Sequence, residues 1–268
     1  MTTSLAQRER RPYTVTGLIK GTVTLDEIQT LLLNWRPSEP VADFAKRVRQ
    51  EGILTKQTAM RVQDLVLQVF RQWFLKPNDQ AARWLKAFVE ANGDRQVLNE
   101  LVFLYKARRE TVLYDFVLEC FWPACHEGEL YLRTADIEDF VRDAQQTGRT
   151  TKRWSPQTQA RLAQGVFGAL TEAGFLSKER YYAREYVLYR VSDFTLAYLA
   201  HDLHLAGITD GMLVAHPDWR LFGLTREHTL ERLDALDERA GMILQRAGSL
   251  VRITWLYTSM EEVIYAYT

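Results

Sequence analysis

The chain has 268 residues, of which 47% are hydrophobic and 25% are charged, and its formal net charge at pH 7 is zero. This composition excludes a disordered chain and is typical of a globular protein with two or three packed units. No N-terminal signal pattern and no run of about 20 apolar residues occurs, so we expect a soluble cytoplasmic protein that does not span a membrane.

The zero net charge conceals alternating basic and acidic blocks. Residues 1–71 hold 11 Lys and Arg against 7 Asp and Glu, and residues 142–190 hold 9 against 4. The other two blocks are acidic, with 8 against 12 in residues 72–141 and 6 against 11 in residues 191–268. Because the field at a contact is local, the basic blocks are able to bind a polyanion. A mixed solvated surface would give the same counts.

The N-terminal region predicts a helix-turn-helix domain over residues 1–78. Residues 1–12 indicate a flexible basic arm, and the prolines of "RPSEP" separate two short helices at 25–35 and 41–50. Gly52 then turns the chain before a long helix capped at or near Thr55. Three helices with a glycine turn before the third follow the helix-turn-helix order.

A helical linker block is expected next, over residues 79–109, with helices at 79–91 and 95–106 around the "NGD" break. Residues 110–192 then predict a winged-helix domain, because helix, strand, helix, helix and β-hairpin follow one another. These elements are expected at 110–121, in "ELYLR" (129–133), at 135–145, in "WSPQTQARLAQGVFGALTEAGFL" (154–176) and in "LSKERYYAREYVLYRVS" (176–192).

Residues 193–268 predict a C-terminal helical region with a second hairpin. We expect helices at 194–205 and 226–239, and a hairpin that turns at Ala247–Gly248. The predicted fold class is therefore mainly α, with helix-turn-helix and winged-helix modules, a helical linker block and short β-hairpins.

Two stretches exactly 100 residues apart repeat one another. "TKQTAMR" at 55–61 and "SPQTQAR" at 155–161 share the pattern Ser/Thr-x-Gln-Thr-x-x-Arg, and the apolar positions of the following turns agree. Core packing leaves surface positions free, so agreement of exposed Gln, Thr and Arg is the more specific signal. We interpret the two stretches as the starts of two recognition helices, with Arg61 and Arg161 in equivalent places.

The residue types of this repeat suit a duplex. A capped helix start leaves N–H groups and the positive end of the helix dipole for a phosphate, while Gln and Arg bind base edges or phosphates. Gly165 and Gly168 share the polar face of the second helix; they would let a duplex approach closely, or admit a neighbouring helix. The predicted DNA-binding residues are Lys56, Gln57, Thr58, Arg61, Arg149, Lys152, Arg153, Gln157, Thr158, Arg161, Gln164, Lys178, Arg180 and Arg184.

Six stretches of the chain carry a family resemblance: "YTVTGLIKG", "DEIQTLLLNW", "ILTKQTAMRVQDLVLQVFRQWF", "NELVFLYKARRETVLYDFVLE", the 154–176 stretch and "HPDWRLF". In these stretches the chain resembles BrxA proteins, which are small components of bacterial BREX phage-defence systems. The resemblance implies a mostly helical protein that binds double-stranded DNA and serves an antiviral defence system, with other BREX proteins as partners. A relationship of this family to the antitermination factor NusB has been proposed, so RNA binding is one alternative function. The other alternative is that of a protein–protein adaptor.

No catalytic, metal or cofactor site is predicted, and no small-molecule substrate. Cys120 and Cys125 with His126 would need a fourth ligand to hold zinc, so we expect free thiols near a core. His201 and His204 lack a third ligand nearby in the sequence. The acidic residues at 136–139 are those expected in the first turn of any helix.

Overall fold

The computed structural model describes residues 12–14, 17–19, 23–55, 57–178, 182–248 and 250–268. It is mainly helical, with two small antiparallel two-stranded sheets, as predicted. The predicted basic arm, residues 1–12, lies almost wholly outside the described residues. None of the helices in the described part of the chain is long and apolar enough to cross a membrane.

The first block follows the expected order. It contains a short 3-10 turn and two helices: η1 (Gly17–Ile19), α2 (Leu25–Asn34) and α3 (Val41–Gln50). A longer helix follows without a break as α4 (Ala59–Asp64), a π-helical segment (Leu65–Phe70) and α5 (Arg71–Phe74). The cap of this helix is Thr58 and not Thr55, because the side chain of Thr58 accepts the N–H of Arg61. The helix therefore begins at Ala59.

The middle of the chain consists of helices with one short sheet. The helices up to this sheet are α6 (Gln80–Glu90), α7 (Arg95–Arg109) and a continuous run of α8 (Thr111–Phe116), a π-helical segment (Val117–Phe121) and α9 (Trp122–His126). Strand β1 (Tyr131–Arg133), α10 (Thr134–Gln146), α11 (Pro156–Glu172) and β2 (Ala183–Glu185) complete this part.

The predicted hairpin at 176–192 is only partly present. Strand β2 pairs antiparallel with β1, with Leu132 opposite Arg184, and a single bridge joins Leu176 to Tyr186. Residues 187–192 form no strand, and residues 179–181 lie outside the described part of the chain.

The C-terminal block packs helices against a hairpin. It comprises α12 (Asp193–Leu205), α13 (Asp210–Leu213), η4 (Pro217–Phe222), α14 (Arg226–Asp234), η5 (Glu238–Ala240), β3 (Met242–Ala247), β4 (Leu250–Trp255) and α15 (Met260–Tyr267). The predicted helix 226–239 is too long, because Asp237 caps a separate turn. The hairpin turns one residue later than predicted, with Ala247 paired to Leu250.

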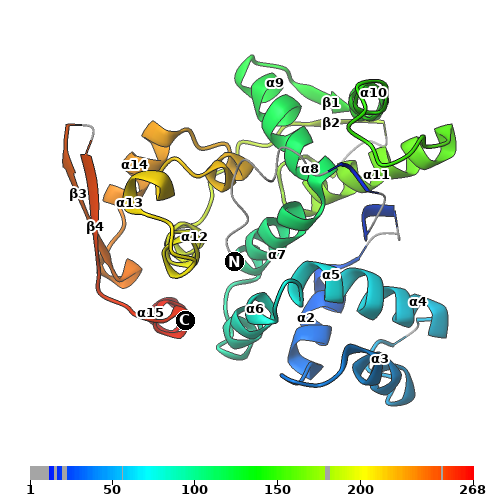
Figure 1. Ribbon diagram of the computed structural model, residues 1–268, viewed down its shortest axis with the longest axis horizontal. Coiled ribbons are helices and arrows are strands. Elements are labelled where there is room, and N and C mark those ends of the chain that lie inside the picture. The colour runs from blue at the N-terminus through cyan, green and yellow to red at the C-terminus, as the bar shows by residue number, and fades with distance from the viewer. Residues whose placement is uncertain (1–11, 15–16, 20–22, 56, 179–181, 249) are drawn as a thin grey trace.

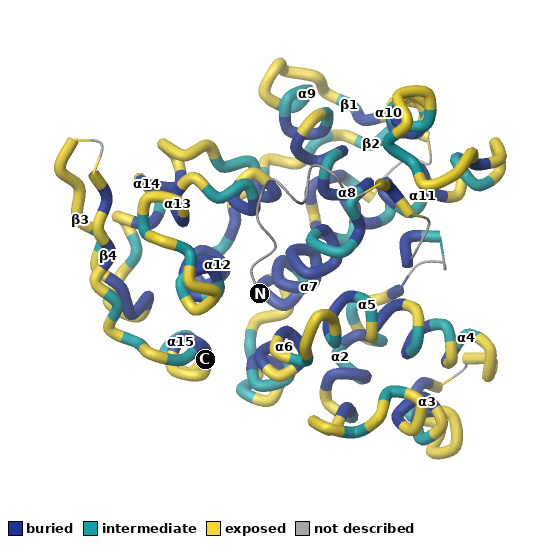
Figure 2. Tube along the Cα trace, in the orientation of Figure 1, coloured by how far each residue is buried: buried dark blue, intermediate teal, exposed yellow. Residues whose placement is uncertain are grey.

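These parts surround helix α7, which lies at the centre of the molecule (Figure 1). The C-terminal block lies on one side of it, and the blocks of α2–α6 and α8–α11 lie on the other. Figure 2 shows α7 as an almost continuously buried tube, and nearly every residue from Val97 to Ala107 is buried. The segment predicted to be a linker is thus the core element that all the blocks share.

Four charged side chains of α7 and of the residue that follows it are held in this buried centre. Glu100 accepts hydrogen bonds from the Tyr189 hydroxyl (2.7 Å) and from the Ser192 hydroxyl (2.6 Å). Ser192 is the residue that caps the start of α12. Lys106 pairs with Glu172 at the end of α11, with 3.1 Å between Nζ and Oε2.

The other two charges reach opposite sides of the molecule. Arg108 pairs with Asp202 at 2.6 Å and with Asp218 at 2.7 Å, both in the C-terminal block. The Glu110 carboxylate accepts the Gly17 N–H (3.1 Å) and the Trp73 indole N–H (2.9 Å). Each of these groups therefore fixes a different part of the chain against the central helix.

We predict that Arg108→Ala lowers the free energy of unfolding by about 3–5 kcal/mol, because it leaves a buried carboxylate without its charge partner. Asp218 is only 2% exposed at its side chain. The exposed Arg83 of α6, which pairs with Asp79 at the cap of that helix, is the matched control; Arg83→Ala should leave the free energy of unfolding almost unchanged, because solvent screens an exposed ion pair. Urea denaturation measures the free energy of unfolding of both variants. Equal losses of stability would contradict a structural role of the buried Arg108 ion pairs.

Candidate nucleic-acid interface

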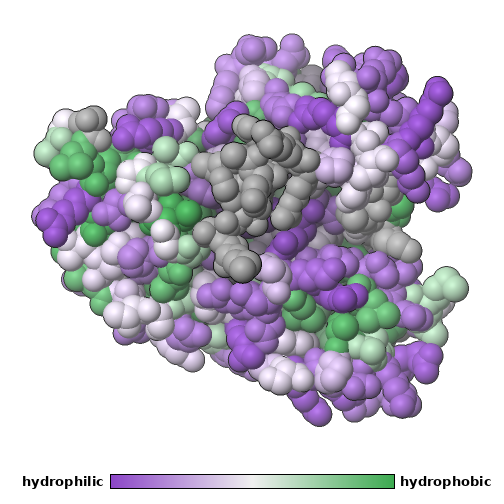
Figure 3. Space-filling model, viewed as in Figure 1, coloured by the Kyte–Doolittle hydropathy of each residue, from purple (hydrophilic) through white to green (hydrophobic). Residues whose placement is uncertain are grey.

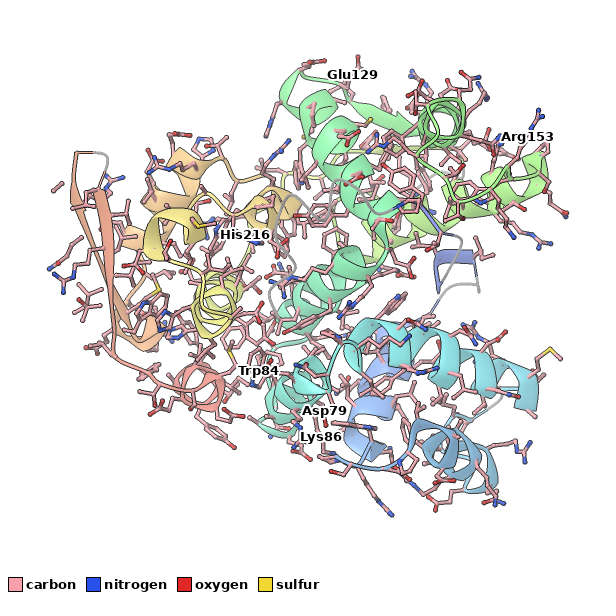
Figure 4. All side chains as sticks on the ribbon, viewed as in Figure 1. Asp79, Trp84, Lys86, Glu129, Arg153 and His216 are labelled. Atoms are coloured by element: carbon pink, nitrogen blue, oxygen red, sulfur yellow. The ribbon has the colours of Figure 1, made fainter. Side chains whose placement is uncertain are left out.

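The start of α11 presents a cluster of exposed basic and polar side chains. Ser155 caps this helix by accepting the Thr158 N–H at 3.2 Å, and Pro156 occupies its first turn. Lys152 and Arg153 precede the cap and are exposed. Figure 4 shows Arg153 at the outer edge of this block. This end of α11 therefore combines exposed cations with the positive end of the helix dipole.

Two predicted contact residues on the next turns are also available to a partner. Gln157 and Arg161 are exposed, and neither side chain forms a hydrogen bond or an ion pair with another described residue. Gln164 is exposed one turn further on. We call the set of Lys152, Arg153, Gln157 and Arg161 the α11 basic face.

The first copy of the repeat is engaged within its own block. The Gln57 amide donates to Glu27 at 2.9 Å, and Arg61 lies 3.9 Å from the same carboxylate. The Arg61 side chain is 20% exposed, and Thr58 serves as the helix cap. These residues support the start of α2, whose capping box also uses Glu27. Lys56 lies outside the described residues.

The two arginines do not hold equivalent places at their helix starts, so that prediction is wrong. Arg61 is the third residue after its cap, Thr58, whereas Arg161 is the sixth residue after Ser155. The buried stripes of the two helices do agree, for example at Val62 and Leu162. The repeat thus preserves the core-facing side while the caps differ by three residues.

Gly165 is needed for a contact inside the protein and not for a duplex. A Cβ atom placed there would lie 2.3 Å from the Leu18 carbonyl oxygen of η1. The N-terminal segment therefore covers the middle of the polar face of α11. Gly165 is small because this neighbouring segment packs against it, as the second of the two interpretations from the sequence had it. Gly168 has no atom within 4 Å of such a Cβ atom.

The segment before η1 is tied to the loop that precedes α11. The Tyr13 N–H donates to the Arg149 carbonyl at 2.6 Å, and the Tyr13 hydroxyl donates to Asp115 at 2.7 Å. The Arg149 guanidinium lies 4.8 Å from the Tyr13 ring centroid and pairs with Asp115 and Glu119 at 2.8 Å each. Burial raises the pKa of Asp115, against the opposing effect of its bonds to Tyr13 and Arg149. Arg149 thus has a structural role that the sequence did not indicate.

The predicted wing cations lie near α11 in different settings. Arg184 on β2 stacks at 4.9 Å on the Phe167 ring and donates to the Thr171 hydroxyl. Lys178 is exposed, and both residues line a cavity beside α11. Arg180 lies outside the described residues.

Four of the residues considered for metal chemistry are partly or fully buried: Cys120, Cys125, His201 and His204. Burial raises the pKa of the Cys120 thiol to about 11, and it also raises that of Cys125. His201 is buried with Nε2 2.8 Å from the Ala240 carbonyl oxygen, and His204 stacks on Trp255. Among the described residues, no group of three His, Cys, Asp or Glu side chains is placed to hold a metal ion.

Comparison with known proteins gives one family match. A family model described as BrxA matches residues 11–194, which is more than half of the chain. The matched region includes η1, both copies of the repeat and β2, and it ends at the start of α12. No curated protein matches the chain.

We predict that Gly165→Ala and Gly168→Ala change stability in opposite directions. The added methyl group at Gly165 must displace η1, with a loss of about 1–3 kcal/mol. The same change at Gly168 meets open space and should gain about 0.5–1 kcal/mol from helix propensity. Thermal and urea unfolding of the two variants measures the difference, and similar stabilities would disprove the contact of η1 with α11.

Proposed function

Because this chain belongs to the BrxA family of BREX phage-defence components, we propose that it is a non-catalytic component that binds double-stranded DNA. We further propose that α8, β1, α10, α11 and β2 form a winged helix with α11 as its recognition helix; the order of these elements and the Leu176–Tyr186 bridge support this. The arrangement of α2, α3 and α4 follows helix-turn-helix order in the same way.

The observation that supports this proposal most strongly is the α11 basic face. Its cations lie at a capped helix N-terminus, which is where phosphate oxygens meet backbone N–H groups most favourably. Arg161 and Gln157 have no partners within the described residues, so binding a duplex would break no internal contact. Arg61 and Gln57, in contrast, would have to leave Glu27.

The exposed part of α11 favours DNA binding that tolerates many sequences. η1 covers the middle of α11, so the helix offers mainly its first turns and the loop before them. Contacts of this kind with phosphates position a protein without reading bases. We therefore expect affinity to fall with salt by about 0.9 log units per log unit for each phosphate that is neutralised.

We predict that Arg161→Ala weakens duplex binding at every sequence and reduces the salt slope by about one, as loss of a single phosphate contact should. Arg61→Ala should have a smaller effect, because Glu27 already holds Arg61. The control is Arg83→Ala, which removes the same charge from α6. The measurement is fluorescence anisotropy of one labelled duplex at several salt concentrations.

The same titrations, repeated with a labelled RNA hairpin, separate the alternatives. If Arg161→Ala behaves like Arg83→Ala, α11 is not the contact helix. A flat salt response would favour a protein–protein adaptor, and tighter binding of an RNA hairpin than of the duplex would favour the NusB-like alternative.

A further inference from the structure

The hairpin of β3 and β4 has one closed edge and one open edge. On β4, the Ile253 N–H donates to the Asp210 carboxylate of α13 at 2.9 Å, so this N–H points away from β3. Leu244 of β3 lies opposite Ile253, and both residues of such a non-hydrogen-bonded pair turn their backbone groups outward. The Leu256 N–H donates to the Gly241 carbonyl at 2.8 Å, which fits the same alternation.

The outer side of β3 consequently presents backbone groups without partners. Hydrogen-bonded and non-hydrogen-bonded pairs alternate, so Arg246 also turns its N–H and C=O groups away from β4. These groups of Leu244 and Arg246 form no hydrogen bond with any described residue. Gln245, Arg246 and Ala247 are exposed, so this half of the strand is open to solvent. We call the backbone groups of Leu244 and Arg246 the β3 edge; such an edge is a template for a further strand.

The side chains around the β3 edge combine apolar groups with positive charge. Ile243 is 50% exposed and Leu250 is 68% exposed, and Figure 3 shows hydrophobic atoms at the tip of the hairpin, at the left edge of the molecule. Arg246 and Arg252 are exposed, and neither forms an ion pair with another described residue. Strands β3 and β4 contain no acidic residue, so their only charges are positive.

These groups fit an extended acidic peptide segment better than they fit DNA or a second copy of the chain. The β3 edge offers N–H donors and C=O acceptors, and a peptide backbone matches both, whereas phosphate oxygens only accept. A second copy would pair β3 with β3, which has no carboxylate for Arg246. Successive side chains of an added strand point to opposite faces, so an acidic one would lie beside Arg246 and an apolar one beside Ile243.

We propose that the β3 edge binds an extended acidic segment of another protein, which adds a third strand to the hairpin. Hydrogen bonds to the backbone of Leu244 and Arg246 supply the affinity, and the charge of Arg246 selects acidic sequences. The β3 edge is separate from the α11 basic face, and it lies beyond residues 11–194, the region that the family model matches.

Fluorescence titration of the full chain with labelled peptides tests this proposal. The probe is a peptide of alternating valine and glutamate. The controls are the corresponding valine–lysine peptide and a valine–glutamate peptide methylated on every backbone nitrogen. We expect the probe to bind, the lysine peptide to bind about tenfold more weakly, and the methylated peptide not to bind, because it has no N–H groups to donate. Equal binding of all three peptides, or no binding of the probe, would overturn the proposal.

Variants and amide hydrogen exchange locate the binding. Arg246→Pro removes an outward N–H at an exposed edge position, where proline is tolerated, and should abolish binding. Arg246→Ala removes only the charge and should weaken binding several-fold, whereas Arg252→Ala, which removes the same charge from β4, should have little effect. In NMR measurements the probe should slow exchange of the Leu244 and Arg246 amides more than that of Gln245, which already pairs with β4.

Unchanged binding in both Arg246 variants, with unchanged amide exchange, would show that the β3 edge is not the site. Two other results would overturn the acidic segment as its occupant. Protection of the Leu244 and Arg246 amides in a dimer of the chain alone would assign the β3 edge to a second copy. Their protection by duplex DNA, and not by the probe, would assign it to nucleic acid.

Discussion

The arrangement of the molecule depends on the buried charges of α7. Charged groups in a protein interior are costly unless each has a partner of opposite charge or several hydrogen bonds. Glu100, Lys106, Arg108 and Glu110 meet this requirement with partners from other segments of the chain. Misplacing one block would leave a charge without its partner, so these pairs specify where each block sits, in addition to the hydrophobic core that the blocks share.

This fixed arrangement determines which part of α11 is available. Glu110 holds Gly17, and the Leu18 backbone then lies where a side chain at Gly165 would be. The N-terminal segment covers the middle of the helix, while its first turns and the loop before them stay exposed. The proposal of DNA binding follows from this division, because it assigns the contact to the exposed cations at 152–161.

Local signals in the sequence predicted most of the helices. Caps such as Ser155, proline breaks and apolar spacing depend on neighbours within a few residues, so they are visible without a structure. The contacts that define the site are between distant residues: Tyr13 with Arg149, Leu18 with Gly165, and Gln57 with Glu27. A sequence pattern shows that Gly165 is small but not what approaches it. For the same reason α7 resembled a linker, because its charged residues carried no sign of their buried partners.

We propose that the second copy of the repeat, and not the first, contacts DNA. It is tested most directly by placing a photocrosslinking amino acid at Gln157 or at Gln57, which hold the same position in the repeat and are both exposed. After irradiation with a labelled duplex, we expect a strong protein–DNA crosslink from position 157 and little from position 57. Equal crosslinking from both positions, or crosslinking from position 57 alone, would contradict it.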